Sequence, residues 1–69
     1  MSIIKVIEIL AESNESWEDA AQSALAEASK SIRNIRSIWV KNLNAEVKEG
    51  KVTLWRLNCK ISFEKDGSK

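Results

Sequence analysis

The sequence predicts an α+β domain with the order strand, helix, strand, strand and a three-stranded antiparallel sheet. Two periodic patterns of apolar residues and the composition of one segment predict this fold class. Apolar residues alternate with polar ones from Trp55 to Glu64, and they recur at helical spacing from Trp17 onward. Isoleucine and valine dominate residues 3–10, as is typical of a strand. The 69 residues include no proline and no low-complexity linker, so we expect one domain over 1–69.

The first strand is predicted over residues 3–10, where apolar side chains fall on both faces. The AESNES segment that follows is rich in side chains that hydrogen-bond locally. Within it, Ser16 stands three residues before Asp19, a spacing close to that of a capping box. A helix is therefore predicted to begin there, since apolar residues then recur at steps of one, three and four as far as Ile35.

The second and third strands are predicted to form a hairpin. After about Asn34 the apolar spacing changes to two, and its phase shifts between Val40 and Leu43, as happens at a β-bulge or a strong bend. The KEGK segment, in which Gly50 can adopt a positive φ, predicts a tight turn into the third strand. We expect residues 64–69 to be a frayed tail.

The connections between the elements predict the strand order. A helical crossover makes the first two strands run in the same direction, and the hairpin makes the third strand antiparallel to the second. The all-antiparallel solution places the third strand in the centre, in the order 1-3-2. One helix covers only one face of such a sheet. Burying the surplus apolar surface, at about 25 cal/mol per Å², would be worth as much as the whole stability of so small a domain, so we expect self-association.

Composition narrows the function classes. The net charge is +1, with 11 basic and 10 acidic residues interspersed along the chain, so we expect no specific binding to nucleic acid or to a membrane surface. Neither a signal peptide nor a membrane anchor fits the N-terminal sequence. The single cysteine, Cys59, is predicted to be an inert core thiol, and the location is predicted to be cytoplasmic.

Most of the residue combinations that enzymes use for catalysis are missing from the sequence. Without histidine, one chain cannot build a Ser-His or Cys-His couple, and two glycines cannot make a glycine-rich phosphate loop. Acidic pairs such as Glu18/Asp19 and Glu46/Glu49 are interpreted as a solvated charged surface. The chain is therefore predicted not to be an enzyme.

Three tryptophans are the most informative side chains. Trp17 and Trp55 lie on predicted apolar faces and are assigned to the core. Trp39 lies on the opposite side of its strand from Ile38 and Val40. It is therefore predicted to point away from the helix, toward a subunit contact or a ligand.

Several motifs along nearly the whole chain carry a resemblance: SWEDA at 16–20, IRNI at 32–35 and KISFE at 60–64. With them the chain resembles the dodecins. The resemblance implies a strand-helix-strand-strand subunit that assembles into a hollow homododecamer. The predicted partner of the chain is therefore other copies of itself. The resemblance further implies a role in binding, storing and photochemically quenching flavin (riboflavin, FMN or FAD), without turnover.

The resemblance also implies where a ligand would bind. Flavin-binding dodecins stack the flavin on a tryptophan of the second strand and hydrogen-bond it through a glutamine of the third. Ser37 stands at the position of that tryptophan and Arg56 at the position of the glutamine, while Trp39 lies two residues further along the same strand face. The predicted cofactor-binding residues are therefore Ser37, Trp39 and Arg56, with no catalytic residue and no metal ligand.

This altered pocket leaves two interpretations open. In the first, Trp39 supplies a displaced stacking platform and Arg56 hydrogen-bonds or stacks on a planar ligand, flavin. In the second, which we favour, the chain keeps the shell but is ligand-free or binds a metal or coenzyme A in place of flavin. In both interpretations the protein is a non-enzymatic homododecamer.

Overall fold

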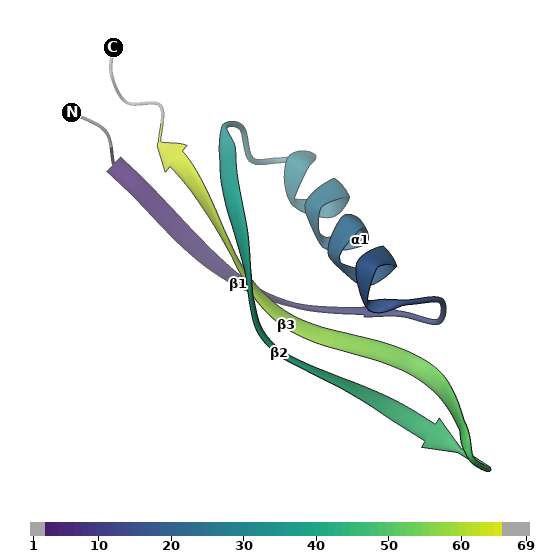
Figure 1. Cartoon of the computed structure of the whole chain (residues 1–69). Coiled ribbons are helices and arrows are strands. Elements are labelled where there is room, and N and C mark those ends of the chain that lie inside the picture. Colours follow the sequence, from purple (N-terminus) through teal and green to yellow (C-terminus); the bar gives the residue numbers. More distant parts are fainter. Residues whose placement is uncertain (1–2, 66–69) are drawn as a thin grey trace.

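The computed structural model describes residues 3–65, and its elements follow the predicted order. They are β1 (Ile3–Ser13), α1 (Trp17–Ser29), β2 (Ile35–Lys48) and β3 (Lys51–Lys65). The strands form one antiparallel sheet in the order β1-β3-β2, with α1 on one side of it (Figure 1). The fold class, the element order and the position of the third strand in the centre are thus confirmed.

The core lies between α1 and the middle of the sheet. Strand β3 contributes three fully buried side chains, Leu57, Cys59 and Ile61, which alternate along the strand as predicted. Ile61 lies opposite Ile7 of β1 and Ile38 of β2, so the centre of the sheet is aliphatic on this face. The burial of Cys59 agrees with its assignment to the core.

Small residues let α1 approach the sheet closely. Alanines at four-residue spacing, Ala20, Ala24 and Ala28, are its buried positions, and the helix contacts β1 and β3. Its start is the predicted one, because the Ser16 hydroxyl accepts a hydrogen bond from the backbone N–H of Asp19 at 2.9 Å.

The helix is shorter than its apolar spacing predicts. It ends at Ser29, with Lys30 as its C-cap, so the prediction that the pattern continues in a helix to Ile35 is wrong. Asn34 adopts a left-handed φ of 62°, which asparagine tolerates better than most residues. The turn brings Ile35 opposite Phe63 of β3, so the last apolar residues of the pattern pack on the core from outside the helix.

The sheet extends further than predicted at both of its ends. β1 continues to Ser13 instead of ending at residue 10, because the long β3 offers a partner to every residue of the extension. Glu64 and Lys65 pair with Ile4 and Ile3, so the prediction of a frayed segment is wrong for these two residues. The remainder of the predicted tail, 66–69, lies outside the described residues.

The β2–β3 hairpin has the predicted irregularity and the predicted turn. The register shifts between Val40 and Asn42, where the apolar phase changes in the sequence. Glu49 and Gly50 form a two-residue loop with φ values of 52° and 76°, as a type I′ turn requires. Two further register shifts, near each end of β2, have no such signal in the sequence.

The face of the sheet that α1 does not cover is called here the uncovered face. Several large apolar side chains are exposed on it: Ile4, Val6, Leu10 and Trp39. The β2–β3 hairpin also extends well beyond the helix (Figure 1), and Leu43, Val47 and Val52 of its two strands are exposed. One chain therefore leaves a large part of its apolar surface in water, as the prediction of a surplus that one helix cannot cover requires.

Candidate functional site

The three predicted site residues all lie on the uncovered face, but they do not meet in one chain. Ser37 and Trp39 of β2 lie opposite Ser62 and Lys60 of β3, whereas Arg56 lies four residues before Lys60. At about 3.3 Å per residue, that separation is about 13 Å along the strand. Within one chain the structure thus brings Ser37 and Trp39 together and leaves Arg56 at a distance.

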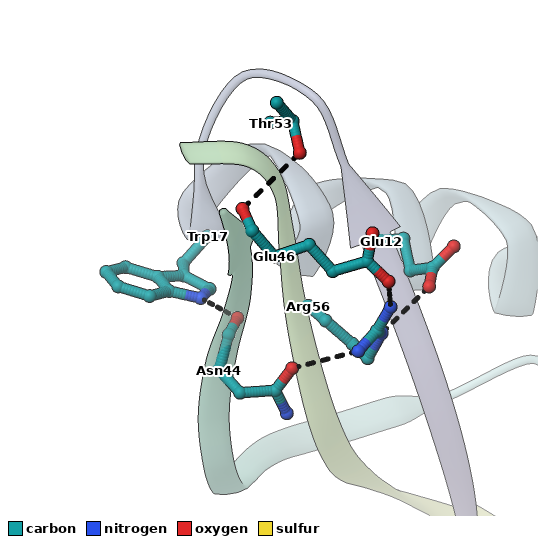
Figure 2. Close-up of polar contacts among 6 residues, drawn as sticks. All are labelled: Glu12, Trp17, Asn44, Glu46, Thr53 and Arg56. Atoms are coloured by element: carbon teal, nitrogen blue, oxygen red, sulfur yellow. Dashed lines mark hydrogen bonds and ion pairs between the residues drawn. The ribbon is translucent and has the colours of Figure 1, made fainter. Parts of the chain in front are cut away.

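Arg56 is held by hydrogen bonds to both neighbouring strands (Figure 2). Its Nε donates to Glu12 Oε2 at 2.8 Å, and its Nη2 donates to Glu46 Oε2 at 2.7 Å. Its Nη1 donates to Asn44 Oδ1 at 3.1 Å. The hydrogen bond to Glu12, followed by the one to Glu46, raises the pKa of the guanidinium. The side chain is 24% exposed and ties all three strands together.

Ser37 has an internal partner as well. Its hydroxyl lies 2.6 Å from the hydroxyl of Ser62, and one of the two donates to the other. Ser62 is buried, although it belongs to the uncovered face, because Ser37 and Val6 flank it on the adjacent strands. At the position where resemblance implies a stacking ring, the chain therefore has a small, hydrogen-bonded side chain.

Trp39 is the exposed aromatic of the uncovered face, as predicted. Its side chain is 58% exposed and lies opposite Lys60. A second cation lies nearby, since Lys41 donates to Glu8 Oε2 at 3.0 Å across β3. The hydrogen bond from Lys41 and the charge of this lysine lower the pKa of Glu8. Trp39 thus offers an accessible ring beside two lysines and one carboxylate.

The other two tryptophans are less buried than predicted. Trp17 is 37% exposed, and its Nε1 donates to the backbone carbonyl of Asn44 at 3.0 Å (Figure 2). Its assignment to the core is therefore wrong: the ring lies at the edge of the core and links the start of α1 to β2. Trp55 is half-buried on the helix-covered face, opposite Ser13 and Ala45.

The partners of Arg56 were missed in the sequence. Glu12 was expected in a loop, and Glu46 was interpreted as part of a solvated acidic pair. Asn44 has two roles, because its side chain accepts from Arg56 and its backbone carbonyl accepts from Trp17. The signal that could have found them is the register of β3, which places Arg56 directly between Glu12 and Asn44.

The described residues 3–65 offer no ready metal centre within one chain. No group of three or more acidic or cysteine side chains among them is arranged to hold an ion. Burial raises the pKa of the Cys59 thiol, which keeps it protonated and poorly nucleophilic. A hollow of about 170 Å³ lies where Ser31–Asn34 pass Phe63–Lys65, and it includes none of the three predicted site residues. In the part of the chain that the structure describes, no helix has the length and apolarity to span a membrane.

Together the fold and the site define a class: a small α+β chain whose uncovered sheet face combines exposed apolar side chains with candidate ligand contacts. The Dodecin family model matches residues 3–66. The chain therefore belongs to the dodecin family, and the resemblance inferred from its motifs is confirmed.

The relatives support the same conclusion. A calcium dodecin from Mycobacterium tuberculosis is 38% identical over 65 residues, which are 93% of this chain and 90% of that protein. The crystal structure of a calcium-chelating calcium dodecin from the same organism, described with a novel calcium-binding site, shares 35% identity and a TM-score of 0.80, over 99% of this chain and 97% of that one. An arginine-to-alanine variant of the Thermus thermophilus dodecin shares 27% identity and a TM-score of 0.91, over 96% and 98%.

Proposed function

We propose that residues 1–69 form one dodecin subunit that assembles with itself into a hollow homododecamer, a non-enzymatic, cytoplasmic shell that holds a small ligand other than flavin. One observation carries the assembly: large apolar side chains such as Val6 and Leu10 are exposed on the uncovered face, and the single helix cannot reach them. Burying such surface between copies is one of the ways in which a chain of this size gains stability, and a single cysteine cannot form a disulfide within the chain.

The state of Arg56 supports a ligand other than flavin. Three of its five N–H groups already donate to Glu12, Asn44 and Glu46, so the guanidinium is held by its own chain and has only two donors left for a flavin. Ser37 offers no stacking surface, and its hydroxyl is bonded to Ser62. The calcium named for the mycobacterial relatives is one candidate ligand. In this chain Glu12 and Glu46 are both paired with Arg56, so a calcium ion would have to draw ligands from more than one copy.

The test is the mass and the absorption spectrum of the freshly purified protein. Light scattering is expected to give about twelve times the 7.8 kDa mass of the chain, as for a closed symmetric assembly. The spectrum is expected to lack the visible band of flavin. A monomer or dimer at micromolar concentration would exclude the shell, and a stoichiometric flavin band would exclude a ligand other than flavin.

Flavin is the second candidate, and the exposure of Trp39 is the observation that favours it. A flat ring stacked on an exposed indole gains on the order of 1 kcal/mol, and two copies could sandwich a ligand between their Trp39 rings. Titration with riboflavin and FMN measures this directly. Quenching of flavin fluorescence that Trp39→Leu abolishes would support the site, with Val40→Ala, on the other face of the same strand, as control. Unchanged fluorescence at tens of micromolar protein counts against flavin.

A further inference from the structure

Arg56 and its partners carry more negative than positive charge. Two carboxylates, Glu12 and Glu46, each approach the guanidinium within 2.8 Å, and Asn44 supplies a neutral oxygen. One positive and two negative charges leave this part of the uncovered face with a net charge of −1. An arginine at a ligand position would ordinarily be taken as an anchor for an anion. Here its charge is already more than balanced inside the chain.

We propose that Glu12 and Glu46 are specificity-determining positioning residues, which make the Arg56 end of the uncovered face reject anionic ligands and admit neutral or cationic planar ones. The proposal rests on the proposed function, because it assigns a preference to the ligand surface of the shell. The two carboxylates act through Arg56: they hold its guanidinium in place between the strands and cancel its attraction for a phosphate or carboxylate.

The geometry of the guanidinium supports this role. It is planar, and its bonds to Glu12, Asn44 and Glu46 use all three of its nitrogens. Two of its five N–H groups remain, one on each Nη nitrogen, but an anion that accepted from them would approach a guanidinium whose charge two carboxylates already neutralise. A neutral ring can instead lie against the guanidinium without breaking any of these bonds.

The Trp39 end of the uncovered face has the opposite sign. Lys41 and Lys60 outnumber Glu8 there, so this end has a net charge of +1. The two ends are about 13 Å apart along β3 at about 3.3 Å per residue. A ligand with one charged group is therefore oriented by this polarity, with an anionic group toward Trp39 and away from Arg56.

The experiment compares two probes that share one ring system and differ in charge, neutral riboflavin and anionic FMN. Their dissociation constants are measured by fluorescence quenching with the intact protein, for the wild type and for Glu12→Gln/Glu46→Gln. Glutamine keeps an oxygen that accepts from Arg56 and removes the charge. The variant is expected to bind FMN about tenfold more tightly relative to riboflavin than the wild type does, because the local charge changes from −1 to +1.

The matched control is Glu18→Gln/Glu27→Gln, which removes the same total charge from exposed positions on α1. It is expected to leave the ratio of the FMN and riboflavin dissociation constants within a factor of about two of the wild-type ratio, since exposed charges far from the ligand are screened. The single variant Glu46→Gln, which keeps the Glu12 pair, is expected to lie between the wild type and the double variant. It also serves if circular dichroism shows that the double variant does not fold.

The results separate this inference from the proposed function. The inference is overturned if the ratio of the FMN and riboflavin dissociation constants changes less than threefold between the wild type and the double variant, or if both flavins gain affinity equally. It is also overturned if neither flavin binds to any variant. Where the wild type shows no quenching, its dissociation constant enters the comparison as a lower bound. The proposed shell is tested independently by the mass of each variant in light scattering.

Discussion

Ile61→Ala is expected to lower the free energy of unfolding by about 2–5 kcal/mol, as for other large-to-small core substitutions. Ile61 is fully buried in the central strand, between Ile7 and Ile38, with α1 packed on the same core. A domain of this size is expected to have about 3–10 kcal/mol in total, at 0.05–0.15 kcal/mol per residue. The substitution therefore removes a large share of the stability and is expected to lower the melting temperature by roughly 8 °C or more.

Urea denaturation followed by circular dichroism measures this effect. Ile61→Val is the graded control, since it removes one methyl group from the same site and is expected to cost about 0.5–1.5 kcal/mol. The titrations are run at several protein concentrations, because the apparent stability of an oligomer depends on concentration. An alanine variant as stable as the valine variant would show that the centre of β3 is not the tightly packed core described here.

Leu10→Lys is expected to raise the dissociation constant of the assembly by about 100-fold or more, because an unpaired charge is costly to bury. Leu10 lies on the uncovered face of β1, opposite Asn58, and its side chain is 62% exposed in the single chain. In the proposed assembly, a lysine there would be buried against the apolar surface of another copy, whereas in a single copy it would be in water. The fold of the chain is therefore expected to persist while the oligomer dissociates.

Size-exclusion chromatography with light scattering over a dilution series measures the dissociation. Ser23→Lys, on the exposed face of α1, introduces the same side chain away from the sheet and is expected to leave the mass unchanged. If Leu10→Lys retains the wild-type mass down to nanomolar concentration, the uncovered face around Leu10 is not the surface that joins the copies.

Local patterns were sufficient to predict most of the fold. The alternation along β3 predicted its buried face from Leu57 to Ile61, and the phase shift after Val40 predicted the bulge. The sequence failed at element ends, because an end depends on the partner strand. β1 runs to Ser13 since β3 is long enough to pair with it, and α1 stops at Ser29 since the chain must turn to bring Ile35 to Phe63.

The candidate site was predicted only in part. Strand periodicity correctly placed Trp39 on the uncovered face, because orientation across a strand is a local property. The partners of Arg56 are 44, 12 and 10 residues away in the sequence, and no local rule selects them. The assignment of Ser37, Trp39 and Arg56 to a ligand remains a prediction, which the flavin titrations test.

The sequence by itself determined the α+β class, the strand order and the excess of apolar surface, because these follow from side-chain periodicity and from the rules for connecting strands. Only the tertiary structure decided that Arg56 is surrounded by Glu12, Asn44 and Glu46. The physical reason is strand register, because pairing β1 and β2 with the same central strand brings residues that are distant in the sequence side by side. Arg56 thereby becomes the centre of a charge cluster with a net charge of −1.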